Sequence, residues 1–241
     1  MTQVFECVAC LHQKIGRLRP MVCDRCGRSE TYAIADTPGN DSRAFSVEDV
    51  SLEEPERYPT GDESLDSALL GGFVRPSTLT AFGLGGVGKS RSALRWATHL
   101  GTTLLVSLEM PKDLAFLSAQ KARADLSNLK VVDHENWQSE ALRLKAKIVI
   151  LDSYHYSQKQ RLVKGTKVPL VCYELSEWAK HHNGIAMLIA HINKKGRVSG
   201  TTAAEHWPDY LFKFEPHGND EAKIIITKAR YAPKGSAIVT I

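Results

Sequence analysis

A phosphate-binding loop constrains this chain more strongly than any other feature of its sequence. Residues 83–90 read GLGGVGKS, a complete match to the pattern G-x-x-x-x-G-K-[ST]. Residues 78–82 before the loop alternate as a strand would, and the residues after it place four apolar side chains on one helical face: Ala93, Trp96, Ala97 and Leu100. A strand, a glycine-rich turn and a helix N-terminus in this order cradle a polyphosphate, so the chain is predicted to bind a nucleoside triphosphate.

The residues of this loop have distinct expected roles. Glycines let the backbone wrap the phosphates, while the amides and the helix N-terminus face their negative charge. Lys89 is expected to reach the β- and γ-phosphates, and the Ser90 hydroxyl is expected to complete the coordination of Mg²⁺. The predicted nucleotide-binding residues are Gly83, Gly85, Gly86, Val87, Gly88, Lys89, Ser90 and Arg91.

Length and composition bound the class of protein. A chain of 241 residues has room for one α/β domain and a small module. The sequence has no run of about 18 apolar residues, and its first residues lack a secretion signal, so a cytoplasmic location with reduced thiols is expected. The net charge of +4 is too small to identify a partner by itself.

Four of the five cysteines have the spacing of metal ligands. Cys7 and Cys10 are followed, twelve residues later, by Cys23 and Cys26. Two C-x-x-C knuckles can direct four sulfurs at one Zn²⁺, which predicts a closed structural site, and Gly27 suits the turn of the second knuckle. Disulfides are the competing interpretation, which a reducing compartment disfavours.

Two further residues are expected to stay outside this metal chemistry. His12 lies between the cysteine pairs and is expected to face solvent or DNA. Cys172 falls in a predicted helix, with Leu175 and Ala179 at i+3 and i+7, so a buried and inert thiol is expected there.

The chain is expected to divide into three segments: a zinc ribbon over 1–34, an acidic linker of low order over 35–57, and an α/β core over 58–241. The core alternates apolar runs with helical patterns, which indicates a mostly parallel sheet with helices on both faces. The predicted strands are 78–82, 104–108, 148–151, 186–190, 222–227 and 237–241, the last two as an antiparallel pair. The predicted helices are 90–100, 111–124, 137–145 and 169–182, with Gly184 as the C-cap of the last.

Polar residues directly follow three of the apolar strands. They are Glu109, Asp152 and His191, and ligands of such sheets bind where the strands end. Asp152 is therefore expected to hold Mg²⁺ through a water, Glu109 to polarise the water that attacks the γ-phosphate, and His191 to sense that phosphate. Each residue taken singly is a weak signal, because an Asp or Glu at the end of a strand is often only the N-cap of the next helix.

Two basic loops predict contact with nucleic acid. Residues 153–167 carry four Lys or Arg, two tyrosines and no acid, and residues 193–201 add three cations. Cations mixed with aromatic rings suit sequence-tolerant binding of a single strand. The predicted contact residues are Tyr154, Lys159, Arg161, Lys164, Lys167, Lys194, Lys195 and Arg197. Packing against the sheet is an equal alternative for Tyr154.

Several motifs together resemble bacterial RadA/Sms proteins of the RecA superfamily. Residues 61–73 are similar to the stretch that opens the RadA ATPase core, and residues 189–206 to its sensor strand and following loop. Residues 228–231 read KARY where RadA proteins have Lys-Asn-Arg-Phe, and residues 107–110 are equally similar to DnaB-type helicases. The resemblance stops at Ile241, so the Lon-protease-like C-terminal domain of full-length RadA proteins is expected to be missing.

The resemblance implies a RecA-like P-loop fold and a ring, expected to be hexameric, that binds ATP between subunits. Lys228 and Arg230 would then reach the γ-phosphate of a neighbour's nucleotide, although exposed strand-end cations are the simpler interpretation. It also implies that the two basic loops line the pore of the ring.

Two function classes remain open on the sequence. The first is an ATP-driven DNA translocase or helicase, acting on single-stranded or branched DNA in recombination, repair or replication. The second is a non-motor mediator or clamp that binds single-stranded DNA under ATP control and docks a partner through its ribbon. The set of Glu109, Asp152, Lys228 and Arg230 favours the first class, and the missing domain favours the second.

Overall fold

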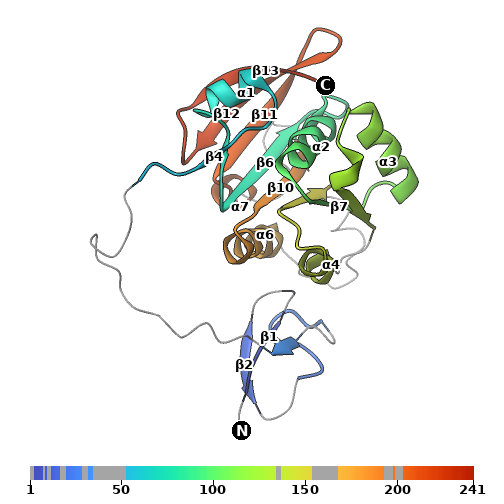
Figure 1. Ribbon diagram of the computed structural model, residues 1–241, viewed down its shortest axis with the longest axis vertical. Coiled ribbons are helices and arrows are strands. Elements are labelled where there is room, and N and C mark those ends of the chain that lie inside the picture. Colours follow the sequence, from blue (N-terminus) through green and yellow to red (C-terminus); the bar gives the residue numbers. More distant parts are fainter. Residues whose placement is uncertain are drawn as a thin grey trace. The chain divides into compact units, whose positions relative to one another are not determined.

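The computed structural model describes residues 3–7, 9, 12–16, 20–28, 32–34, 53–133, 137–153, 168–192, 198 and 203–241 (Figure 1). The chain forms two compact units, Met1–Glu56 and Arg57–Ile241. None of the helices in these described ranges is long and apolar enough to cross a membrane.

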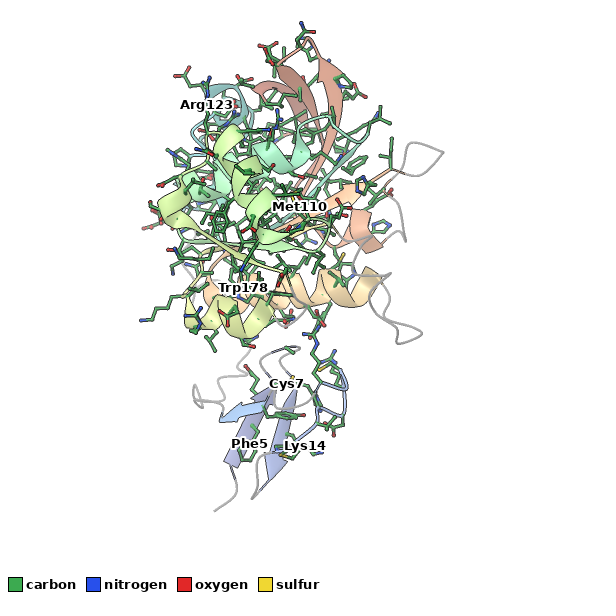
Figure 2. The ribbon with its side chains drawn as sticks, turned by 90° about the vertical axis from the view of Figure 1, so that its right-hand side faces the viewer. Phe5, Cys7, Lys14, Met110, Arg123 and Trp178 are labelled. Carbon is green, nitrogen blue, oxygen red and sulfur yellow. The ribbon has the colours of Figure 1, made fainter. Side chains whose placement is uncertain are left out.

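The N-terminal unit holds a small antiparallel sheet with the strand order β2-β1-β3. Its strands are β1 (Gln3–Cys7), β2 (Gln13–Gly16) and β3 (Tyr32–Ile34). The buried apolar residues among those described are Phe5, Cys7, Ala9, Cys23 and Tyr32, and Figure 2 labels the first two. So small a core supplies little hydrophobic stabilisation, which is the situation in which a bound metal is needed to hold a fold together.

The C-terminal unit is built on an eight-stranded sheet with the order β13-β12-β11-β6-β10-β9-β7-β8. The six strands from β11 to β8 run parallel, and β12 and β13 extend the sheet as antiparallel neighbours. The strands are β6 (Ser77–Gly83), β7 (Thr103–Ser107), β8 (Leu129–Val132), β9 (Ile148–Asp152), β10 (Ile185–His191), β11 (Tyr210–His217), β12 (Glu221–Ala229) and β13 (Gly235–Thr240). A separate pair, β4 (Arg57–Tyr58) and β5 (Phe73–Val74), precedes β6.

Helices cover both faces of this sheet, as the sequence pattern predicts. Side chains alternate along β10, so that Met187 packs in one core and Leu188 in the other. The first core is covered by α2 (Lys89–Leu100) and α3 (Lys112–Lys121), and the second by α4 (Trp137–Arg143) and α6 (Val168–His182). The shorter helices are α1 (Glu63–Ala68), η2 (Leu126–Asn128) and α7 (Ala203–His206). Figure 1 shows α2 with α3 and α6 with α4 as two groups.

The six predicted strands and four predicted helices are all present, but the pattern does not predict β8 or β11. The prediction that Gly184 is the C-cap of α6 is also wrong. The left-handed residue that ends α6 is Asn183, with φ of 45°, rather than Gly184. Gly184 is required for another reason: a Cβ there would lie 2.7 Å from the Trp178 ring and 2.8 Å from the Lys147 carbonyl oxygen (Trp178 is labelled in Figure 2).

The strand β6 lies between β10 and β11 and carries the phosphate-binding loop at its end. An aromatic group fixes the helix that follows the loop, because Trp96 of α2 is fully buried against the rings of Phe212 and Phe214 on β11. The loop is therefore held between two rigid elements, which is the setting that phosphate binding requires.

Candidate functional site

The phosphate-binding loop begins where β6 ends and leads directly into α2. Gly83 has a φ of 154°, and a Cβ there would lie 2.5 Å from the Phe214 carbonyl oxygen. Gly88 occupies the N-cap of α2 in the left-handed conformation, with φ of 91°, and a Cβ there would collide with the Ile241 side chain. Both positions therefore require glycine, and α2 begins directly after the second of them.

Lys89 is buried at the first turn of α2, with 5% of its surface exposed. Its ammonium donates hydrogen bonds to the carbonyl oxygens of Gly83, at 3.0 Å, and of Leu84, at 2.6 Å. Burial lowers its pKa, while the nearby charges of Asp152 and Glu109 oppose that effect. The positive charge is thus held within the loop, where a polyphosphate is expected to bind.

Asp152 ends β9 beside the loop, and its carboxyl group is almost fully buried. Burial raises the pKa of this carboxyl group, a hydrogen bond with Ser90 lowers it, and the neighbouring charge of Glu109 raises it again. The Ser90 hydroxyl and the Asp152 carboxylate therefore lie side by side. Hard oxygen donors of this kind fit Mg²⁺, so these two residues would hold the ion that accompanies a nucleoside triphosphate.

Glu109 and His191 meet in front of the same strand ends. The two side chains approach to 3.2 Å, between Glu109 Oε1 and His191 Nε2, and each is more than a third exposed. Ser153 donates a hydrogen bond from its hydroxyl to the same Oε1 at 2.5 Å. The group lies together because β7, β9 and β10 are parallel neighbours that end at one edge of the sheet, here called the P-loop edge.

The sequence patterns did not identify Ser153 as part of this group. The sequence offers one signal for it, which is its position directly after Asp152. In the structure its hydroxyl is fully buried and therefore needs an acceptor. The structure thus brings together Lys89, Ser90, Glu109, Asp152 and His191, as their positions after the strands predict, and adds Ser153.

The two remaining predicted catalytic residues, Lys228 and Arg230, lie elsewhere. β12 is antiparallel to β11, so its last residues pair with the start of that strand, with Ala229 opposite Tyr210. Lys228 donates to the carbonyl oxygen of His206 at 2.6 Å, and burial lowers its pKa, as does the charge of Arg230. Arg230 borders a cleft of about 460 Å³ that is also lined by Ser77, Thr78 and Asp209.

This cleft lies at the edge where β6 and β11 begin, opposite the P-loop edge. The seven residues of β6 separate the two edges by about 20 Å, at the ordinary rise of a strand. Neither cation can therefore reach the phosphate-binding loop of its own chain. If either cation acts on a bound nucleotide, the nucleotide must therefore be bound to a second copy of the chain.

Three cysteines of the N-terminal unit, Cys7, Cys23 and Cys26, lie close enough together to share a metal ion. The sulfurs of Cys7, Cys23 and Cys26 all lie within 4.8 Å of one another, and Cys7 Sγ is 3.7 Å from Cys26 Sγ. Zn–S bonds of about 2.3 Å in a tetrahedron place the sulfurs about 3.8 Å apart. This distance between Cys7 Sγ and Cys26 Sγ is far too long for a disulfide. Cys10, the fourth predicted ligand, lies outside the described residues.

The backbone around this site has the form of a metal knuckle. Gly27 has a φ of 73°, and its amide donates to the carbonyl oxygen of Cys23 at 2.7 Å, as expected for the turn of the second C-x-x-C pair. His12 Nε2 lies 3.5 Å from Asp24 Oδ1, and His12 is not part of the group of three cysteines. Cys172 is buried in α6, and burial raises the pKa of its thiol to about 12, in line with an inert role.

The predicted nucleic-acid contacts cannot be placed. They lie outside the described residues: Tyr154, Lys159, Arg161, Lys164, Lys167, Lys194, Lys195 and Arg197.

The C-terminal unit has a RecA-like P-loop fold. One solved structure of an ATPase domain matches with a TM-score of 0.61 at 15% sequence identity, covering 79% of this chain and 90% of that one. The predicted fold class, a mostly parallel sheet of the RecA-like P-loop type, is confirmed.

The sequence itself is similar to proteins named DNA repair protein RadA. The protein of that name from Campylobacter jejuni is 31% identical over 92% of this chain and 54% of the relative, and the one from Aquifex aeolicus is 28% identical over 90% and 53%. The resemblance to RadA is therefore confirmed. The chain spans about half the length of these relatives. No protein-family model matches it.

The cysteine geometry predicts one Zn²⁺ per chain, measured by elemental analysis of the purified protein. Changing both Cys23 and Cys26 to Ser should abolish this metal, because two ligands cannot hold Zn²⁺ in a closed structural site. Cys172→Ser is the matched control and should retain one equivalent. The melting of the C-terminal unit should be unaffected by the double change, and loss of its cooperative unfolding would contradict separate folding of the two units.

Asp152 predicts a conflict between stability and ion binding. Burial raises the pKa of Asp152 in the folded protein above its value in the unfolded chain. The stabilisation from the neutral carboxyl group is therefore complete below the unfolded-state pKa, and it is lost as the pH rises through the folded-state pKa. Asp152→Asn should therefore raise the melting temperature at pH 7, by about 2–4 °C for each kcal/mol gained in a domain of this size.

The same variant should lose Mg²⁺-dependent binding of nucleotide. Asp133→Asn, at an exposed position after β8, is the control and should alter neither property. A lower melting temperature for Asp152→Asn at pH 7 would contradict the assignment of burial as the dominant influence on this carboxyl group.

Proposed function

We propose that the chain is an ATP hydrolase of RadA type whose complete site forms between two copies and which acts on DNA in recombination, repair or replication. The observation that carries the proposal is the division of the catalytic set between two edges of one sheet. Lys89, Glu109, Asp152 and His191 lie at the P-loop edge, and Arg230 lies about 20 Å away at the opposite edge, by the strand rise.

The residues at the P-loop edge suit attack of water on the γ-phosphate. Lys89 would bind the β- and γ-phosphates, and Ser90 and Asp152 would hold Mg²⁺, which neutralises charge on the phosphate oxygens. Glu109 is accessible enough to orient a water and is held on one side by Ser153. The attack breaks the bond between the γ-phosphorus and the bridging oxygen and releases ADP and phosphate. His191, in contact with Glu109, would report whether the phosphate is present.

Arg230 would supply the remaining positive charge from a neighbouring copy. An arginine that enters a phosphoryl-transfer site from outside stabilises the charge that develops on the γ-phosphate in the transition state. A ring satisfies this need for every subunit at once, and the proposal includes the hexamer that the resemblance implies. Zn²⁺ in the N-terminal unit would be structural.

DNA is the proposed partner because the relatives are named as DNA repair proteins and because two loops of this chain are rich in cations. We extend the proposal to single-stranded or branched DNA and to a cytoplasmic location. A non-motor mediator or clamp, with a recombination or replication protein docked on the ribbon, remains the alternative. ATP hydrolysis with and without single-stranded DNA, measured beside strand displacement on a forked duplex, separates the two: a motor shows both activities, and a clamp hydrolyses ATP without displacing a strand.

The residues at the P-loop edge predict that one substitution abolishes nucleotide binding and that another abolishes hydrolysis alone. Lys89→Ala should abolish binding of a fluorescent ATP analogue, because it removes the charge that faces the phosphates. Glu109→Gln should bind the analogue with wild-type affinity and lose hydrolysis by about 10²-fold or more, the usual contribution of a positioned base. Wild-type hydrolysis by Glu109→Gln would disprove its assignment as the water-orienting group.

The opposite edge predicts complementation between variants. Arg230→Ala should lower hydrolysis by about 10³-fold, as loss of an arginine finger does, with little effect on ATP affinity. Mixed with Lys89→Ala, it should recover partial activity, because some interfaces then pair an intact phosphate-binding loop with an intact Arg230. No recovery at any ratio, with mixed assemblies verified by native mass spectrometry, would count against a shared site.

A further inference from the structure

Asp209 connects Arg230 to the start of β6. Its Oδ1 pairs with Arg230 Nε at 3.2 Å, and its backbone carbonyl accepts a hydrogen bond from the Arg230 amide at 3.0 Å. The Asp209 side chain is 15% exposed and that of Arg230 is 57% exposed. The aspartate therefore belongs to the framework of the sheet, and the arginine extends from it toward solvent.

Thr78 orders the Asp209 carboxylate independently of Arg230. Asp209 Oδ2 accepts hydrogen bonds from both the amide and the hydroxyl of Thr78, each at 2.8 Å. The Asp209 amide in turn donates to the Thr78 carbonyl oxygen at 2.9 Å, which continues the pairing of β11 with β6 by one residue. These bonds hold one carboxylate oxygen and leave the other directed to the guanidinium group.

Exposed ion pairs usually contribute little, because ordering two long side chains costs as much as their attraction gains. Here the carboxylate is already ordered by Thr78, so only the arginine has to be restrained. The pair also engages Nε, and within the described part of the chain the two terminal NH₂ groups of Arg230 make no hydrogen bond or ion pair. Those groups are the ones that bind phosphate oxygens in a bidentate manner.

Lys228 is a second cation beside Arg230, so the Asp209 carboxylate has two positive charges to offset. Lys228 is close enough to Arg230 for the two charges to repel, and Asp209 is close enough to both to offset that repulsion. Without the carboxylate, the two cations would be expected to separate, and the arginine would lose its fixed direction.

We propose that Asp209 is a positioning residue that holds Arg230 in the orientation needed to reach the γ-phosphate of a nucleotide bound to a second copy of the chain. The inference rests on the proposed function, in which Arg230 acts on a neighbour. In this role Asp209 would contact Arg230 and not the phosphate. It acts through Arg230 alone, and the experiment has to separate this role from a general contribution to folding.

The test uses Asp209→Asn in the full chain. Asparagine keeps the size of the side chain and can still accept from Thr78, but it then presents an NH₂ group to Arg230 Nε, donor against donor. The kcat for ATP hydrolysis should fall about tenfold or more while the KM for ATP changes less than about twofold, as for an interaction made only in the transition state. Asp113→Asn, an exposed aspartate on α3, is the charge-matched control and should keep the wild-type kcat.

Two further variants make the result specific to Arg230. In an Arg230→Ala background, adding Asp209→Asn should change kcat by less than about twofold, because coupled residues are not additive. Thr78→Val removes one of the bonds that hold the carboxylate while preserving the shape of the side chain. It should lower kcat severalfold at unchanged KM, and it provides the answer if Asp209→Asn does not fold in a thermal unfolding assay.

The outcomes distinguish this inference from the proposed function. Wild-type kcat for Asp209→Asn beside a severely impaired Arg230→Ala overturns the inference alone. An equal loss from Asp209→Asn in both backgrounds indicates a structural role and also overturns it. Wild-type kcat for Arg230→Ala overturns the proposed function and the inference together.

Discussion

The pairing of β6 with parallel neighbours on both sides is the constraint on which the rest of the structure depends. Its central position directs Gly83 into the phosphate-binding loop at one end and places Thr78 beside Asp209 at the other. A strand buried in this way cannot shift its register without moving apolar side chains out of both cores. The two ends are therefore held at a fixed separation, which one chain cannot bridge with its own side chains.

Burial of charge at the P-loop edge is the cost of this arrangement. Lys89 and Asp152 are both taken largely out of water, and burial favours the neutral form of each side chain. It therefore lowers the pKa of Lys89 and raises the pKa of Asp152. The two groups oppose this effect in each other, since each favours the charged form of its neighbour. A nucleotide with Mg²⁺ would supply the charges that complete the pairing. The site is thus organised for a highly charged ligand at the expense of the stability of the protein without it.

Much of this was predictable because local sequence determines it. The phosphate-binding loop, the strands around 148–151 and 186–190 and the polar residue after each strand follow from short apolar runs and glycine spacing. The meeting of Glu109 with His191 follows from topology, since parallel neighbours end at one edge. Periodicity did not reveal β8, which has only four residues, or β11, whose sequence includes Lys213, Glu215 and Pro216. Long-range partners such as Thr78 and Asp209, 131 positions apart, have no signal in a single sequence.

The central claim is that one chain holds only part of a hydrolysis site. The most direct test measures ATP hydrolysis per chain during serial dilution and determines the mass of the assemblies at each concentration by mass photometry. The account predicts that the rate per chain falls in step with the loss of assemblies and approaches the background rate when only monomers remain. A rate per chain that stays constant as the protein becomes monomeric would contradict a site shared between copies.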